Sequence, residues 1–208
     1  MGFSELARNR HSVRRYTPNL SISDAELIAI FTDVRSSPSS FNLQHWRFVV
    51  VRDQARKQTL RGHAFGQQQV EDCAAVILVC GRLDAYADVA RIYADAPTEM
   101  RDKYVPMIPG VYQNNPGLQR EEAVRSSALA AMTLMYAAKD RGWDTGPMIG
   151  FDAAKVATLL ELDANTIPVM MITLGKALNG AQPARLYRRP LAEIVRSETL
   201  TGPSLQAG

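Results

Sequence analysis

The stretch Ala74-Ala75-Val76-Ile77-Leu78-Val79-Cys80-Gly81 is the longest strongly apolar run of the chain. Its length and its β-branched residues are typical of a strand that is covered on both faces of a sheet. A membrane-spanning helix needs about 20 consecutive apolar residues, so this run is too short to be one. We therefore expect a buried strand near the middle of a sheet, with the remaining elements packed around it.

Two further apolar runs, residues 46–51 and 169–175, predict strands. Helical spacing or a capping residue predicts helices over residues 3–10, from Ser23-Asp24 onward, over 54–61 after Asp53, over 120–141 and from Asp152 to Leu162. The Pro-rich stretch 95–118 is expected to be an irregular lid. Helices around a mostly antiparallel sheet make an α+β fold the expected class.

Composition places the chain among ordinary globular proteins, with 46% hydrophobic and 22% charged residues in a length of 208. No repeat or linker divides it, so we expect a single domain over residues 1–208. A net charge of +3 from scattered residues is a weak argument for nucleic acid, and we expect neither a nucleic-acid nor a membrane partner. The N-terminus does not resemble a signal peptide, so the expected location is cytoplasmic. Cys73 and Cys80 are expected to be reduced, buried thiols.

The C-terminal residues 179–208 contain several prolines and little periodicity before Leu191. A segment of this length without regular structure is uncommon in a compact monomer. We expect an extended arm that needs a partner chain to lie on.

A basic segment, Arg10-His11-Ser12-Val13-Arg14, follows the first predicted helix. In an extended backbone the alternating residues Arg10, Ser12 and Arg14 would point the same way. Two guanidiniums and a hydroxyl on one side suit a dianionic phosphate monoester. The same residues also fit a solvated basic turn.

Three other segments have a composition that suits ligand binding. Asn42 and Gln44 can each donate to a carbonyl and accept from an imide N–H, although local turn hydrogen bonds would also explain them. The stretch 146–150 is read as a loop without an ionisable side chain, so it would bind through its backbone and shape, or simply form a turn. Arg188-Arg189 place paired cations before Pro190, where they either meet a phosphate or are solvated.

In this order and spacing these segments resemble the nitroreductase family of FMN-dependent oxidoreductases, from Arg10 to Arg188. The resemblance implies an α+β sandwich that forms an intertwined homodimer, exchanges its C-terminal arms and holds two FMN molecules at the interface. It implies these cofactor-binding residues: Arg10, His11, Ser12, Arg14, Pro38, Ser39, Ser40, Asn42, Gln44, Pro147, Met148, Ile149, Gly150, Arg188 and Arg189.

The family pattern also implies roles. Residues 10–12 would hold the phosphate and ribityl chain, with Arg14 at the pyrimidine end of the flavin, while residues 38–40 would reach the flavin of the other subunit. The stretch 147–150 would lie against the isoalloxazine with a backbone N–H at N5, and Arg188, the closer match of the two arginines, would close the phosphate site. This chain departs from the usual family pattern at three positions. The family has a small residue at the position of Phe41 and Pro at that of His45, and many members have Glu at that of Ile149.

The implied activity is hydride transfer from NADPH or NADH through flavin N5 to an electron-poor small molecule, by a ping-pong mechanism. The acceptor would be a nitroaromatic, a quinone or an activated alkene or aldehyde. The alternative is a protein that stores or senses FMN without physiological turnover.

Other polar and aromatic residues receive structural interpretations. His45 and His63 are expected to be surface or hydrogen-bonded histidines, and Glu122 a solvated or capping carboxylate. Tyr104, Tyr112 and Trp143 are candidates for the lining of a substrate cavity.

Overall fold

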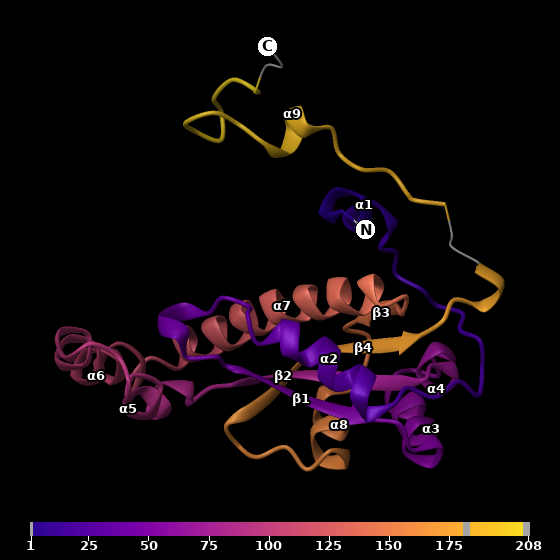
Figure 1. The fold of residues 1–208 in the computed structure, drawn as a ribbon, viewed down its shortest axis with the longest axis horizontal. Coiled ribbons are helices and arrows are strands. Elements are labelled where there is room, and N and C mark those ends of the chain that lie inside the picture. The colour runs from indigo at the N-terminus through magenta and orange to yellow at the C-terminus, as the bar shows by residue number, and fades with distance from the viewer. Residues whose placement is uncertain (1, 181–183, 206–208) are drawn as a thin grey trace.

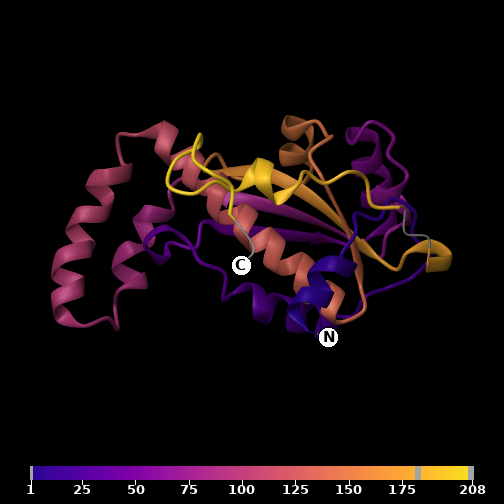
Figure 2. The ribbon, with the colours of Figure 1, turned by 90° about the horizontal axis from the view of Figure 1, so that it is seen from above.

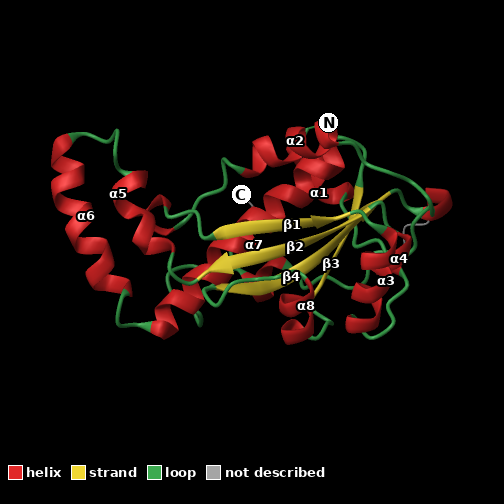
Figure 3. Ribbon diagram, turned by 90° about the horizontal axis from the view of Figure 1, so that it is seen from below, coloured by secondary structure: helices red, strands yellow, loops and turns green. Residues whose placement is uncertain are grey.

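The computed structural model describes residues 2–180 and 184–205. Within them, four antiparallel strands form one sheet in the order β1-β2-β4-β3 (Figure 3). The strands are β1 (Trp46–Val51), β2 (Ala75–Arg82), β3 (Asp144–Met148) and β4 (Thr166–Gly175). The residues from Ala75 to Gly81 are fully buried or nearly so, which confirms the expected central strand.

Helices α2 (Asp24–Val34) and α7 (Pro116–Asp140) cover one face of the sheet, with α1 (Phe3–Asn9) beside α7 (Figure 1). Ser23 caps α2, as the sequence predicts, and forms a complete capping box with Glu26. Helix α7 approaches β2 closely where Ala123 faces Gly81. A Cβ at Gly81 would lie 2.7 Å from the Ala123 carbonyl oxygen, so this approach requires glycine in β2.

Helices α3 (Gln54–His63), α4 (Gln69–Asp72) and α8 (Ala153–Leu159) cover the opposite face. The side chains of Asp53 and Asp152 accept hydrogen bonds at the first turns of α3 and α8, which confirms both predicted starts. The sheet therefore lies between two helical layers, and the expected α+β class is confirmed.

A helical excursion extends beyond one end of the sheet (Figure 2). It consists of η2 (Ala85–Asp88), α5 (Val89–Ile92) and α6 (Thr98–Tyr112). The expectation that residues 95–118 are irregular is wrong, since α6 continues through Pro106 and Pro109. Its buried residues Ile108 and Tyr112 pack in a third apolar cluster, which stabilises the helix despite these prolines.

The stretch 146–148, expected in a loop, is part of strand β3. Because β3 is at the edge of the sheet, it is hydrogen-bonded as a strand to β4 alone. An edge strand tolerates the missing N–H of Pro147, which explains why a Gly-Pro pair occurs within it.

After β4 and η3 (Leu178–Gly180), the described residues 184–205 run away from the sheet and contain only the short helix α9 (Leu191–Ile194) (Figure 1). Several apolar side chains of this arm are mostly exposed: Leu186, Tyr187, Leu191, Ile194, Leu200 and Leu205. The other residues of the predicted arm, 181–183 and 206–208, lie outside the described residues. No helix in the described ranges is both long and apolar enough to cross a membrane.

Candidate functional site

The basic segment lies beside edge strand β3. Ser12 forms a parallel bridge with Thr145, and the Val13 amide donates to the Thr145 carbonyl oxygen at 3.0 Å. Val13 and Tyr16 are buried and anchor the segment, and the Tyr16 hydroxyl donates to the Thr173 carbonyl oxygen at 3.0 Å. This anchoring fixes which way the intervening residues point.

The alternation predicted for the basic segment agrees with the burial of residues 12–14 but does not separate Arg10 from His11. Val13 is buried, Arg10 is partly buried, and Ser12 and Arg14 are exposed. His11 is partly buried, and its Nδ1 lies 2.9 Å from the Asn9 carbonyl oxygen. The segment therefore exposes Ser12 and Arg14, while the Arg10 guanidinium is partly enclosed.

Two cations of the C-terminal arm return to Arg10. Burial lowers the pKa of the Arg10 guanidinium, and the positive charges of Arg185 and Arg188 lower it further, while Tyr136 opposes them. Nη1 of Arg10 is buried and has no hydrogen-bond partner within the described residues. None of these three arginines forms an ion pair with a carboxylate of the described chain, so the cluster is suited to an anion.

Sequence reasoning missed Arg185, whose guanidinium donates to the carbonyl oxygen of Arg10 at 3.2 Å. Of the two arginines it did select, Arg189 forms an ion pair with Glu193 at 3.0 Å. Among the described residues, Arg188 donates to the carbonyl oxygens of Leu186 and Tyr187 and to no carboxylate. Arg188 is thus the freer of the two cations.

Residues Pro147 to Gly150 continue from β3 beside the basic segment. Ile149 is 80% exposed, and Pro147, Met148 and Gly150 are partly exposed. The Gly150 carbonyl oxygen accepts a hydrogen bond from Nε2 of Gln67 at 2.8 Å, a contact that sequence reasoning also missed. The stretch offers an apolar, uncharged surface that follows the point of β3 contacted by Ser12 and Val13.

The amide residues lie in a second region. Pro38 and Asn42 are exposed, Ser39, Ser40 and Gln44 are partly exposed, and buried Leu43 anchors the loop between them. Nε2 of Gln44 donates to the Asn42 carbonyl oxygen at 3.1 Å. Ser39 Oγ accepts from the Gln44 amide at 3.0 Å and Ser40 Oγ lies 2.9 Å from the Tyr112 hydroxyl. The local turn hydrogen bonds expected as the alternative are therefore present, and Asn42 is the exposed amide of the loop.

The strand register separates the two regions. Thr145, beside Ser12, aligns through β4 with Ala75 at the start of β2. Trp46, which follows the amide loop, pairs with Gly81 near the end of β2. Six residues of strand span about 20 Å. The basic segment and the amide loop therefore lie toward opposite ends and at opposite edges of the sheet.

The sequence from residue 7 to residue 176 matches the model of the Nitroreductase family. The chain belongs to the nitroreductase family. This membership confirms the expected family and its class, an NAD(P)H-dependent oxidoreductase.

Relatives of this nitroreductase agree in length as well as in sequence. MhqN of Bacillus subtilis, named as an NAD(P)H nitroreductase, is 38% identical over 93% of this chain and 97% of its own. A solved structure from Exiguobacterium sibiricum, described as a nitroreductase in complex with FMN, is 34% identical. It covers 95% of this chain and 98% of its own, with a TM-score of 0.87. The CLA biosynthesis enone reductase of Lactiplantibacillus plantarum is 31% identical over 84% of this chain and 85% of its own.

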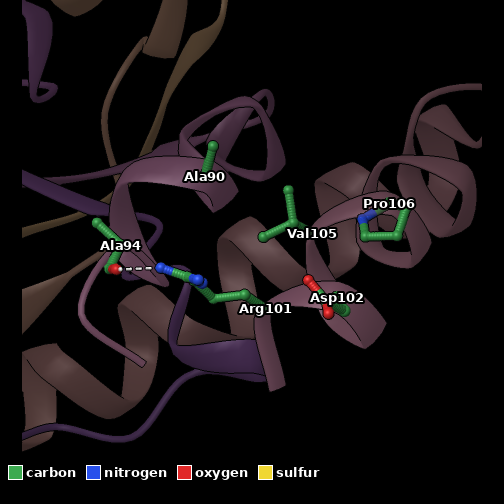
Figure 4. Close-up of a pocket in the computed structure, with 6 residues that line it drawn as sticks. All are labelled: Ala90, Ala94, Arg101, Asp102, Val105 and Pro106. Atoms are coloured by element: carbon green, nitrogen blue, oxygen red, sulfur yellow. Dashed lines mark hydrogen bonds between the residues drawn. The ribbon is translucent and has the colours of Figure 1, made fainter. Parts of the chain in front are cut away.

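An open cavity of about 650 Å³ lies between α5 and α6 of the nitroreductase (Figure 4). Its lining consists of Ala90, Ala94, Arg101, Asp102, Val105 and Pro106. Arg101 donates across it to the Ala94 carbonyl oxygen at 3.3 Å. None of the site residues predicted from the sequence lines this cavity.

Three interpretations of single residues are wrong for this nitroreductase. His45 is 1% exposed and its Nδ1 has no partner in the described chain, so it is neither a surface nor a fully hydrogen-bonded histidine. Trp143 lies in the core between the sheet and α7, with its Nε1 donating to Glu26 at 3.2 Å, and lines no substrate cavity there. Glu122 is buried and paired with Arg125 rather than solvated.

Proposed function

We propose that this nitroreductase uses FMN to pass hydride from NADPH or NADH to an electron-poor small molecule by a ping-pong mechanism. The observation that carries the proposal is Nη1 of Arg10, a buried donor without a partner among the described residues, to which Arg185 of the arm is joined by its hydrogen bond to the Arg10 carbonyl oxygen at 3.2 Å. A phosphate and a flat, mostly apolar ring are the two ends of FMN.

The residues fit the phosphate end. Nη1 of Arg10 is a buried donor without a partner, and a phosphate oxygen would satisfy it. Ser12 would add a hydroxyl, and His11 stands beside them. Arg188 of the arm would complete the phosphate site, whereas Arg189 forms an ion pair with Glu193.

The ring end is assigned to the other exposed groups. When bound, FMN supplies a centre at N5 that takes up hydride from a nicotinamide and yields it to an acceptor. Arg14 would place positive charge at the pyrimidine end, and the backbone of Ile149 and Gly150 would supply a donor near N5. Pro147 and Met148 would leave that face uncharged, and the exposed Ile149 would shape the acceptor site.

We further propose that each FMN site is completed by a second copy of the chain. The amide loop lies far from the basic segment of its own chain, so Pro38, Ser39, Ser40, Asn42 and Gln44 would serve the flavin of the partner. The exposed apolar residues of the arm support exchange of residues 179–208 between two copies, while Arg185 and Arg188 would stay at the Arg10 of their own chain. Each copy would fold as one FMN-binding domain over residues 1–208.

The acceptor would be a nitroaromatic, a quinone or an activated alkene or aldehyde. The relative named as an enone reductase supports the activated alkene among these. The nicotinamide and then the acceptor would bind in turn at the same site on the flavin.

The test is the visible spectrum of the purified, FMN-loaded protein, recorded without oxygen before and after addition of NADPH or NADH. Bleaching of the flavin bands, followed by their return on addition of a quinone, a nitroaromatic or an α,β-unsaturated ketone, is expected. Bands that persist with both nucleotides would instead favour a protein that stores or senses FMN.

A further inference from the structure

The backbone of the amide loop has an unusual conformation. Phe41, Asn42 and Gln44 have φ angles of 50°, 55° and 51°, in the left-handed region. Residues other than glycine rarely adopt it, and a bulky residue such as Phe adopts it least readily. Three such residues among four persist only where the surroundings hold them.

Helix α6 supplies the main anchor through Tyr112, its last residue. The Tyr112 hydroxyl lies 2.9 Å from Ser40 Oγ, and the side chain is 2% exposed. Its ring meets the Phe41 ring edge-on at a centroid distance of 6.4 Å and the His45 ring at 6.3 Å. Tyr112 thus contacts the loop before, within and after the left-handed residues.

The other anchors each hold one point of the loop. The Tyr93 hydroxyl donates to the Phe41 carbonyl oxygen at 3.2 Å, and Arg47 donates to the Gln44 carbonyl oxygen at 3.1 Å. Tyr104 contacts the Phe41 ring at 6.2 Å, but its hydroxyl makes no hydrogen bond with the described residues. Tyr104 is therefore a matched control for the Tyr112 hydroxyl.

Tyr112 is itself fixed in place. Nε2 of Gln119 and the backbone N–H of Asn115 both donate to the Tyr112 carbonyl oxygen, each at 2.9 Å. Because Asn115 and Gln119 lie at the start of α7, the end of α6 is tied to the helix that packs on the sheet. The loop is held to the core through this tyrosine.

We propose that Tyr112 is a positioning residue for the flavin. By holding Ser40 and Phe41 it keeps the loop turned so that Leu43 is buried while Asn42 is exposed and Gln44 partly exposed. The inference rests on the proposed function, in which these amides meet the pyrimidine edge of the partner's FMN. Donors at that edge favour added electron density on the ring, so loosening the loop lowers the flavin midpoint potential.

The experiment compares Tyr112→Phe with Tyr104→Phe in the FMN-loaded protein. Hydrogen exchange of the Asn42, Leu43 and Gln44 amides is expected to be about three- to tenfold faster in Tyr112→Phe, the effect of losing one net hydrogen bond. The midpoint potential is expected to fall and the flavin absorption bands to shift. Tyr104→Phe is expected to match the wild-type protein in all three measurements.

A second variant, Ser40→Ala, removes the same hydrogen bond from the loop side, and its exchange rates should match those of Tyr112→Phe. Exchange that is equally slow in Tyr112→Phe and Tyr104→Phe would overturn the anchoring. Faster exchange with an unchanged potential and spectrum would reduce Tyr112 to a merely structural residue and overturn its role toward the flavin. A wild-type protein that takes up no FMN would overturn the proposed function first, and this inference with it.

Discussion

Ser12 is paired with Thr145 by a parallel bridge, so the basic segment lies alongside edge strand β3. The close approach depends on the next residue of β3, because a Cβ at Gly146 would overlap the Val13 carbonyl oxygen and lie 2.7 Å from Thr173 Oγ1. The segment that presents Arg10 and the stretch that ends at Gly150 are thereby held together.

Replacing Gly146 by Ala should separate this pair. The added methyl group has no room, and such overpacking costs about 1–3 kcal/mol. We expect a lower free energy of unfolding and weaker FMN retention in Gly146→Ala, measured by denaturant unfolding and by flavin absorbance. Gly62→Ala is the control, since nothing lies within 4 Å of its Cβ position and alanine favours a helix. Equal stability of the two variants would contradict the packing argument.

Removing the Arg10 guanidinium should weaken FMN binding. A charge-assisted hydrogen bond contributes roughly 1.5–3 kcal/mol, which corresponds to about a 10- to 150-fold rise in Kd for Arg10→Ala. Arg8→Ala, at an exposed position on α1, which ends just before Arg10, should bind FMN as the wild type does. Unchanged flavin occupancy in Arg10→Ala would count against the phosphate assignment.

The two neighbouring arginines of the arm should differ in their effects. Arg188→Ala is expected to raise the FMN Kd about tenfold or more, whereas Arg189→Ala removes a cation already paired with Glu193 and should have little effect. Fluorescence titration of FMN measures both constants. The reverse order would reassign the phosphate contact to Arg189.

Deleting residues 183–208 should leave a monomer or an aggregate. The arm has mostly exposed apolar side chains, such as Leu186 and Leu191, which a partner chain would cover. Light scattering measures the outcome, and a stable dimer of the truncated protein would refute arm exchange.

His45 should make stability depend on pH. Burial, then the charges of Arg82 and Arg47, lower its pKa from 6.5 to about 4. Between pH 4 and pH 6.5 the unfolded chain binds the proton more readily than the folded chain does. The contribution of neutral His45 to the free energy of unfolding is therefore complete above pH 6.5 and declines as the pH falls toward 4. It amounts to roughly 3 kcal/mol. Unfolding curves of His45→Gln should lack this part of the slope, and an identical slope would show that His45 does not titrate this way.

Local signals predicted much of the fold. Ser23, Asp53 and Asp152 marked helix starts because a side-chain cap acts over three residues, and the run around Leu78 marked the central strand by composition alone. Proline misled twice: Pro147 lies in an edge strand that does not need its N–H, and Pro106 lies in a helix held by buried neighbours. Both outcomes depend on tertiary context.

The same distinction between local signals and tertiary context applies to the candidate site. Alternation predicted that Ser12 and Arg14 are exposed on either side of buried Val13, because it depends only on backbone geometry. The contacts of Arg185 with Arg10 and of Tyr112 with Ser40 could not be predicted in this way, since each joins segments that only the fold brings together. The burial of His45 is likewise a property of the packed chain.

The central claim is that each FMN site takes its cations from one chain and its amide loop from another. Mixing Arg10→Ala chains with Asn42→Ala chains, by co-expression with two affinity tags, tests it most directly. If the site spans two chains, the doubly tagged heterodimer has one intact site and one doubly altered site. It should therefore hold one tightly bound FMN per dimer, where neither parent dimer holds any as tightly. A heterodimer that binds FMN no better than its parents would contradict the claim.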